Sequence, residues 1–161
     1  MLMIRPATAD DAQCILDFII ELAIYEKAPQ EVVTDAAGIR DSLFGASAKA
    51  KALICCIDDK PVGYAVYFYS YSTWLGKNGI YLEDVYVSPA HRGKGAGKAL
   101  LQRLAQIAMQ ENCGRLEWSV LDWNTPAIEF YEALDAIPQS EWIRYRLTGK
   151  ALAALAGSAG E

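Results

Sequence analysis

The amino-acid sequence predicts an α/β (α+β) domain in which most strands are antiparallel and one pair is parallel. Two β-rich runs, residues 52–57 and 62–71, flank the turn sequence Asp-Asp-Lys-Pro, which indicates an antiparallel hairpin. A strand, a long amphipathic helix and a second strand follow over residues 80–121, in the order of a right-handed parallel crossover. With 161 residues, 53% hydrophobic and 22% charged, the chain is long and apolar enough for one domain spanning residues 1–161.

The N-terminal part is predicted to hold one strand and two helices. Residues 1–5 form the strand, and Thr8 followed by two aspartates marks the start of a helix that runs to about Tyr25. A second helix is predicted to begin at Thr34 and to end near Phe44-Gly45. The apolar positions expected to face the core from the first helix are Ile15, Phe18, Ile19, Leu22 and Ala23.

The central part continues from the hairpin into the crossover. Residues 74–79 are predicted to be a loop, and residues 80–87 a strand. A helix follows over residues 95–112, because its apolar residues recur on one face and its charged and amide residues on the other. Residues 116–121 complete the crossover as a strand.

The C-terminal part is predicted to contain three short elements. Asn124-Thr125-Pro126 starts a helix, since proline is well tolerated in a first helical turn. Residues 142–147 are expected to be a final strand, and residues from about 150 to 161 a helical tail that frays.

Composition and charge exclude several classes of protein. Fifteen basic against twenty acidic residues give a net charge of −5, which opposes nucleic-acid binding and favours cationic ligands. No apolar run approaches the roughly 18 residues of a membrane span, and we expect the protein in the cytoplasm. Cys14, Cys55, Cys56 and Cys113 show no C-x-x-C spacing and His91 is the only histidine, so we expect reduced thiols and no metal.

A glycine-rich turn, HRGKGAGKAL at residues 91–100, precedes the long helix. It is not a Walker A loop, because Arg92 stands where that motif needs glycine and Ala99 where it needs a hydroxyl. It also lacks the third glycine of the dinucleotide fingerprint. Arg92, Gly95 and Gly97 do satisfy [RQ]-x-x-G-x-[GA], and the segment resembles the coenzyme A pyrophosphate loop of the Gcn5-related N-acetyltransferases (GNAT).

This turn is suited to hold an anion. Main-chain amides at residues 93–97 open a helix whose dipole favours negative charge, and glycines let a ligand approach the backbone. Arg92 and Lys98 add positive charge. The alternative is that the glycines only provide a flexible connection between strand and helix.

Glu83 and Asp84 interrupt the apolar strand sequence YLEDVYV, where carboxylates are unfavourable. An alkylamine, with a pKa of roughly 10, must lose a proton before it attacks a thioester, and a carboxylate in a partly apolar cleft can accept that proton directly or through water. Because neighbouring strand residues face opposite ways, only one of the two is expected to point into a given cleft. The alternative is a charge pair that faces solvent.

Tyr131 is the candidate general acid, since a phenol can return a proton to the thiolate that leaves coenzyme A. It lies on the short helix predicted to start at Asn124. On its position alone, a packed aromatic side chain is the more common role for such a residue.

The resemblance extends over nearly the whole chain. The segments IRPATADD, ELAIYEKAP, YLEDVYV, RGKGAG, DWN-x-P-A-I-x-FY and a late tryptophan followed by a basic residue occur in the order seen in diamine (spermidine/spermine) acetyltransferases and their thialysine-acetylating relatives. The likeness implies the GNAT fold: a central mixed, mostly antiparallel sheet with one parallel strand pair splayed around the cofactor and helices on both faces. It also implies acetyl-CoA as co-substrate and a homodimer.

The resemblance also assigns roles to residues. It implies Tyr131 as general acid and Glu83 as base. It places acetyl-CoA, including the pantetheine arm along the strand and the pyrophosphate at the turn, against Val85, Tyr86, Val87, Arg92, Gly93, Lys94, Gly95, Ala96, Gly97, Lys98, Asn124, Thr125, Pro126, Ala127 and Tyr131. It places the amine acceptor against Tyr25, Glu26, Glu83, Asp84, Glu117, Trp118 and Ser119.

Two segments depart from the family pattern. The family has glycine four residues after the tyrosine, where this chain has Asp135, and residues 137–143, expected in the acceptor pocket, match poorly. The expected function is acetyl transfer from acetyl-CoA by direct attack of a primary amine on a small cationic molecule, either a polyamine or a thialysine- or lysine-like amino acid. The alternative is a non-catalytic acyl-CoA-binding regulatory module, and a nucleotide hydrolase is a weaker third. We expect no nucleic-acid or membrane partner.

Overall fold

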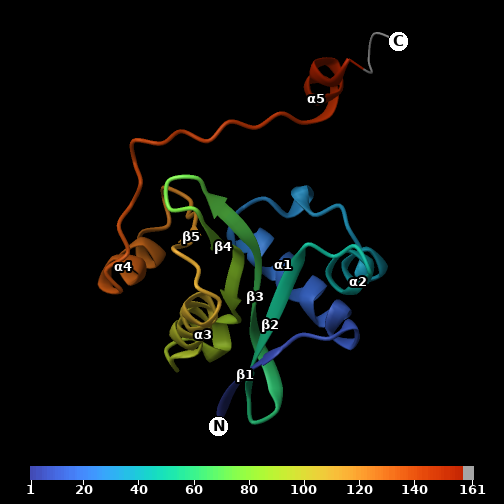
Figure 1. Cartoon of the computed structure of the whole chain (residues 1–161). Helices are drawn as coiled ribbons and strands as arrows, with labels where there is room; N and C mark the ends of the chain where they lie inside the picture. The colour runs from blue at the N-terminus through green and yellow to red at the C-terminus, as the bar shows by residue number, and fades with distance from the viewer. Residues whose placement is uncertain (158–161) are drawn as a thin grey trace. The chain divides into compact units, whose positions relative to one another are not determined.

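A five-stranded sheet of order β1-β2-β3-β4-β5 forms the framework of residues 1–121 (Figure 1). Pairs from β1 to β4 are antiparallel and β4 with β5 is parallel, which confirms the predicted fold class. The computed structural model describes residues 1–157, with a second compact unit beginning at Asp122; a single domain stays a prediction. The strands are β1 (Leu2–Pro6), β2 (Ala50–Ile57), β3 (Lys60–Ser72), β4 (Lys77–Val87) and β5 (Leu116–Trp118).

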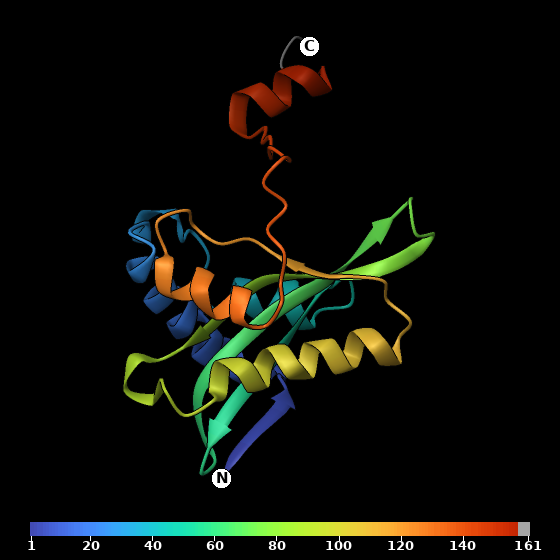
Figure 2. The same ribbon diagram turned by 90° about the vertical axis from the view of Figure 1, so that its left-hand side faces the viewer.

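Helices cover both faces of this sheet, as predicted (Figures 1 and 2). The helices α1 (Ala12–Tyr25) and α2 (Ala36–Phe44) lie on one face, and α3 (Ala96–Gln110) lies on the other. On the first face the ring of Phe18 stacks on that of Tyr64, with centroids 5.5 Å apart. On the second, α3 buries Leu100 and Leu104 completely. The sheet is therefore buried on both sides, which makes it a rigid support for residues on β4.

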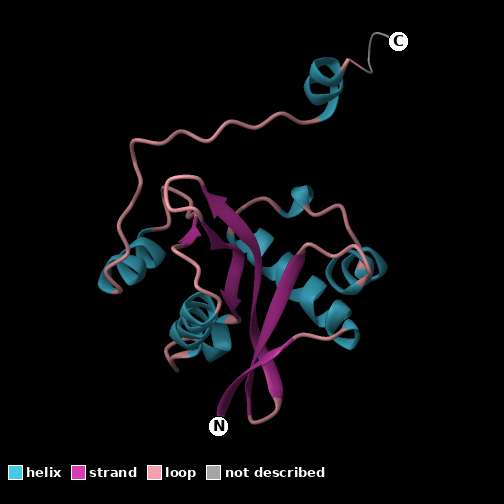
Figure 3. Ribbon diagram, viewed as in Figure 1, coloured by secondary structure: helices cyan, strands magenta, loops and turns pink. Residues whose placement is uncertain are grey.

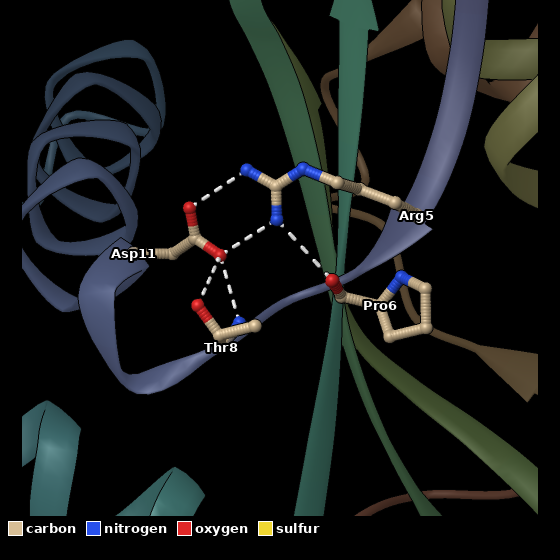
Figure 4. Close-up of polar contacts among 4 residues, drawn as sticks. All are labelled: Arg5, Pro6, Thr8 and Asp11. Atoms are coloured by element: carbon tan, nitrogen blue, oxygen red, sulfur yellow. Dashed lines mark hydrogen bonds and ion pairs between the residues drawn. The ribbon is translucent and has the colours of Figure 1, made fainter.

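The start of α1 is held by a salt bridge (Figure 4). Asp11, which closes a short 3-10 helix η1 (Ala9–Asp11), is buried and accepts from Arg5 Nη1 and Nη2 at 2.8 and 2.9 Å. Its Oδ2 also accepts from the Thr8 main-chain nitrogen at 2.7 Å. Hydrogen bonds from Arg5 lower the pKa of Asp11. Of the predicted core face of α1, Ile15, Phe18 and Ala23 are buried, and Ile19 and Leu22 pack partly buried against the core.

Several predicted boundaries shift by a few residues. The β2–β3 turn contains only Asp58 and Asp59, both with positive φ, and Pro61 already belongs to β3. The predicted loop 74–79 ends at Gly76, because residues 77–79 pair with β3. For α2 the cap is Asp35 rather than Thr34, since Asp35 Oδ1 accepts from the Gly38 nitrogen at 2.8 Å. In each case side-chain or cross-strand hydrogen bonds, which local composition does not specify, decide the boundary.

Cys55 and Cys56 lie buried on β2, as the apolar run predicts. Burial raises the pKa of the Cys55 thiol to about 11. At neutral pH this thiol is therefore protonated and behaves as a small apolar side chain.

A β-bulge interrupts β4 at Glu83. In the β3–β4 register Val66 is opposite Asp84 and Tyr67 is opposite Leu82, so Glu83 has no partner. Val66 and Tyr67 are adjacent, so their side chains face opposite sides of the sheet, and the residue opposite each one shares its face. Asp84 and Leu82 therefore face opposite sides, although residues two apart in a regular strand share a face. The bulge thus turns Asp84 toward the face that α1 covers.

The second unit contains two helices, α4 (Thr125–Ala133) and α5 (Gly149–Ala156) (Figure 3). Residues 142–147 are irregular, so the predicted final strand is wrong. Its aromatic and branched residues favour a strand, but a strand needs a paired neighbour, and residues 122–157 form none within their unit. The predicted helical tail is present as α5, while the part of that prediction at residues 158–161 lies outside the described residues.

The end of α4 has aspartate where the family that the sequence resembles has glycine. Asp135 adopts a left-handed conformation with φ of 65°. The Asp135 nitrogen donates to Glu132 O at 3.0 Å and the Ala136 nitrogen to Tyr131 O at 3.2 Å, which is the hydrogen-bond pattern of a Schellman motif. Aspartate tolerates the left-handed region better than most residues, so the helix ends as it would with glycine.

Candidate cofactor and acceptor site

The glycine-rich turn lies between β4 and α3, as predicted. A short 3-10 helix, η3 (Pro89–His91), leads into it. Gly93 and Gly95 have φ of 78° and 83°, a region that side chains other than glycine rarely adopt. A Cβ atom at Gly93, Gly95 or Gly97 would meet nothing within 4 Å. Any other residue at Gly93 or Gly95 would therefore be strained, while the space beside the backbone of the turn is open.

The main-chain amides of this turn are free to bind an anion. Within residues 1–157, no protein oxygen accepts from the main-chain nitrogens of residues 93–98, and the first helical bond is from the Ala99 nitrogen to Gly95 O at 2.9 Å. Lys94 and Lys98 are exposed beside them. Consecutive free amides at the start of a 15-residue helix fit a diphosphate. The residues present thus fit the pyrophosphate of coenzyme A.

The edge of β4 beyond the parallel pair is open on the β5 side. Within residues 1–121, β5 pairs with β4 only from Ile80 to Leu82. The Ser88 nitrogen donates to Val62 O on β3 at 2.9 Å, and by alternation the main-chain groups of Val85 and Val87 point away from β3. This fits the predicted strand-like pairing with a pantetheine arm. One group is already engaged, however, because Val87 O accepts from Arg92 Nε at 3.0 Å.

Arg92 lies with its charged group between two tyrosines. Its guanidinium carbon is 5.4 Å from the ring centroid of Tyr25 and 5.4 Å from that of Tyr86. Tyr25 is the last residue of α1, and Tyr86 belongs to β4. Two predicted cofactor residues and one predicted acceptor residue are therefore in contact.

A pocket of about 440 Å³ lies between α1, the segment after it, and β4. Its walls are largely apolar, with Leu22 and Val32 among them, and its charged groups are the carboxylates of Glu26, Glu31 and Asp84. Among the described residues that line it there is no lysine, arginine or histidine. The pocket is suited to an aliphatic chain that carries a positive charge.

Asp84, which lines this pocket, is held by Tyr64. The fully buried Tyr64 hydroxyl donates to Asp84 Oδ2 at 2.7 Å. Burial raises the pKa of Asp84, and the Tyr64 hydrogen bond opposes that shift. Partial desolvation, with a contribution from the charge of Asp84, also raises the pKa of Glu26. Within residues 1–157 neither carboxylate forms an ion pair.

Glu83 and Asp84 differ in their surroundings. Asp84 is half-buried and lines the pocket, whereas Glu83 is exposed at the bulge and does not line it. The role of Glu83 as base stays a prediction.

On β5, the predicted acceptor residues Glu117 and Trp118 pair in register with Tyr81 and Leu82. Ser119 follows the strand, which is shorter than predicted, and its Oγ lies 2.7 Å from Tyr81 Oη. These residues lie along the parallel pair and do not line the pocket.

The remaining predicted site residues belong to the second unit. Asn124 caps α4, with Oδ1 accepting from the Ala127 nitrogen at 3.4 Å, and Thr125 and Pro126 form its first turn. The Tyr131 ring lies on α4 with its centroid 5.7 Å from that of Phe130. Their contacts with cofactor and with Glu83 stay predictions.

Sequence reasoning missed Tyr64, Glu31 and Glu21. Tyr64 lies 20 residues from Asp84, and only the strand register brings the two together. Glu21 accepts from Ser88 Oγ at 3.3 and 3.2 Å and so links α1 to the end of β4. The hydroxyl of Tyr64 inside an apolar strand was a signal that could have indicated a buried polar partner.

Two features are absent from residues 1–157. No helix there combines the length and apolarity that crossing a membrane requires. No group of three histidine, cysteine or carboxylate side chains there is arranged to hold a metal ion.

Comparison with known proteins gives consistent matches. The sequence profile of the acetyltransferase (GNAT) family matches residues 19–135. Thialysine N-epsilon-acetyltransferase from Bos taurus is 40% identical over 96% of this chain and 97% of its own length. Spermidine/spermine N(1)-acetyltransferase-like protein 1 from Homo sapiens is 36% identical over 92% of this chain and 23% of its own. The solved structure of integron cassette protein VCH_CASS6 from V. cholerae superposes with a TM-score of 0.81 at 28% identity, covering 96% of this chain and 97% of that one.

Proposed function

The chain belongs to the acetyltransferase (GNAT) family, and we propose that it transfers the acetyl group of acetyl-CoA to a primary amine of a small cationic acceptor. The observation that carries this proposal is the open turn before α3, whose amides at residues 93–98 have no protein acceptor within residues 1–157. The main-chain groups of Val85, which point away from β3, support a pantetheine arm that extends along β4 toward Glu83.

Each step of the reaction can be assigned to a residue of this chain. Bound acetyl-CoA supplies a thioester whose carbonyl carbon an amine can attack. Glu83, exposed at the bulge of β4, would take a proton from the ammonium form of the acceptor, directly or through a water molecule. Tyr131 would donate its phenolic proton to the departing sulfur. The bulge supports this assignment, since bulges re-aim side chains next to active sites.

The pocket beside Asp84 and Glu26 supports a cationic acceptor. Two carboxylates with raised pKa values and apolar walls would bind an alkylammonium group more tightly than a neutral or anionic one. One relative is named for acetyl transfer to thialysine, and another is named as similar to spermidine/spermine N(1)-acetyltransferase. We therefore propose a polyamine or a thialysine- or lysine-like amino acid as acceptor. A cytoplasmic location and a homodimer stay predictions from the sequence.

Thiol release from acetyl-CoA in the presence of different amines tests the proposal. The panel contains polyamines, thialysine, lysine, aminoglycosides and peptides, with acetyl-CoA alone as the blank. We expect cationic alkylamines to accelerate release. If coenzyme A binds but no amine accelerates release, the protein is a non-catalytic acyl-CoA-binding module instead.

Two variants test the assigned roles. Tyr131→Phe should lower kcat by about 100-fold or more while coenzyme A affinity changes little, because general acid catalysis contributes on the order of 10²–10⁴. Glu83→Gln should flatten the acidic limb of the pH–rate profile. A wild-type kcat in the first variant, or a wild-type profile in the second, would remove that residue from the mechanism.

A further inference from the structure

Arg92 is the residue through which the cofactor turn contacts the end of α1. Its guanidinium lies 5.4 Å from the ring centroids of both Tyr25 and Tyr86. Its Nε donates to Val87 O at 3.0 Å, and its own main-chain nitrogen donates to Pro89 O at 3.3 Å. One side chain thus joins the turn, β4 and the last residue of α1.

The geometry suits arginine in particular. A planar guanidinium can lie against two aromatic rings while a separate N–H donates in its own plane, which an ammonium group on a flexible stem does not reproduce. The hydrogen bond to Val87 O fixes the direction of the group, and both rings lie within cation–π distance of its charge. The conformation of the turn and the position of Tyr25 are therefore tied to each other.

Tyr25 is directly followed by a residue of the acceptor pocket. Glu26 caps α1, with its nitrogen donating to Leu22 O at 2.9 Å, and its carboxylate lines the pocket. A shift of the Tyr25 ring would move this main chain, and with it the carboxylate. A second link runs in parallel, because Ser88 Oγ, at the end of β4, donates to Glu21 on α1.

From these contacts we propose that Arg92 is a positioning residue that couples cofactor binding to acceptor binding, an inference that rests on the proposed function. Coenzyme A binds the turn, the turn holds Arg92, and Arg92 holds Tyr25 and Glu26 in place for the amine. Because coupling between two binding sites is reciprocal, the identity of the ring at residue 25 affects coenzyme A affinity even though that ring lies on α1.

Isothermal titration with coenzyme A provides the test. Tyr25→Leu removes the ring and should raise the dissociation constant about two- to fivefold, the size of one exposed cation–π contact. Tyr25→Phe keeps the ring and is the matched control, with an affinity close to wild type. In an Arg92→Gln background, which keeps the [RQ]-x-x-G-x-[GA] pattern, Tyr25→Leu should have no further effect.

A second readout is the affinity for spermidine with and without saturating coenzyme A. The dissociation constant for spermidine without coenzyme A, divided by that with saturating coenzyme A, should exceed one in the wild type and fall toward one in Arg92→Gln and Arg92→Lys. These exposed substitutions decide the question even if Tyr25→Leu does not fold. Equal coenzyme A affinities for Tyr25→Leu and Tyr25→Phe, or a loss that persists in the Arg92→Gln background, would overturn the coupling alone. A wild-type protein with no affinity for coenzyme A would overturn the proposed function as well.

Discussion

Removal of the Asp11 carboxylate should destabilise the protein by an amount that its hydrogen bonds allow us to estimate. Asp11 accepts two bonds from Arg5 at 2.8 and 2.9 Å and one from the Thr8 nitrogen at 2.7 Å (Figure 4). Hydrogen bonds to a charged group contribute about 1.5–3 kcal/mol each, but the Arg5 side chain is 33% exposed and recovers part of its hydration. We expect Asp11→Ala to lower the free energy of unfolding by about 2–4 kcal/mol.

The assay is chemical and thermal unfolding at neutral pH. For a chain of this length, a loss of 1 kcal/mol lowers Tm by about 2–4 °C, so the expected drop is about 4–16 °C. Asp10→Ala is the matched control, because Asp10 is the exposed neighbour in the same turn and forms neither the Arg5 nor the Thr8 bond. Its change should stay within about 0.5 kcal/mol.

The pH dependence of this effect has a defined sign. Since the pKa of Asp11 is lower in the folded protein than in the unfolded chain, its contribution is full above the unfolded pKa of about 3.9. It is lost as the pH falls through the lower folded pKa. The stability gap between wild type and Asp11→Ala should therefore narrow in acid. Equal unfolding free energies for Asp11→Ala and Asp10→Ala at pH 7 would refute the reasoning.

Two further predictions concern the site. Asp84→Asn keeps an acceptor for the Tyr64 hydroxyl but removes a carboxylate whose pKa is raised by burial. The variant should therefore have a higher Tm at pH 7, lose that advantage below the unfolded pKa of about 3.9, and bind a cationic amine more weakly. Thermal melts and titration with spermidine measure these effects, and a lower Tm at pH 7 would contradict this account. Gly95→Ala forces alanine to φ of 83° and should lower the free energy of unfolding by about 1–2 kcal/mol. Gly97→Ala, within α3, should raise that free energy by about 0.5–1 kcal/mol. Denaturant unfolding measures both changes, and changes of the same sign would count against the turn geometry.

Much of the fold could be predicted because its elements carry strong local signals. The helix α3 has apolar residues on one face, and the β2–β3 hairpin has two apolar runs around a turn, so both were predicted to within a few residues. The glycine turn was predicted from its spacing, and the structure gives Gly93 and Gly95 the positive φ values that such spacing requires. These features depend on neighbours along the chain, which a sequence shows directly.

Features that depend on register were not predictable in the same way. The bulge at Glu83 is defined by which β3 residue lies opposite each β4 residue, and it decides that Asp84 faces the pocket. The strand alternation predicted that one of the two carboxylates would face a given cleft but not which one. The prediction of a strand at residues 142–147 was wrong for a similar reason. Its residues have a high strand propensity, but they have no partner strand within residues 122–157.

The two carboxylates of the pocket connect stability with the proposed function. Asp84 and Glu26 have raised pKa values, which means that the folded protein disfavours their charged forms. With no ion pair to either within residues 1–157, their charges reduce stability at neutral pH. An alkylammonium group bound between them would offset this cost and lower both pKa values, so acceptor binding would release protons wherever the free carboxyls are partly protonated. The same desolvation that makes Asp84 unfavourable for folding therefore makes it effective for a cationic acceptor, and this is why one substitution there is expected to raise Tm and weaken binding together.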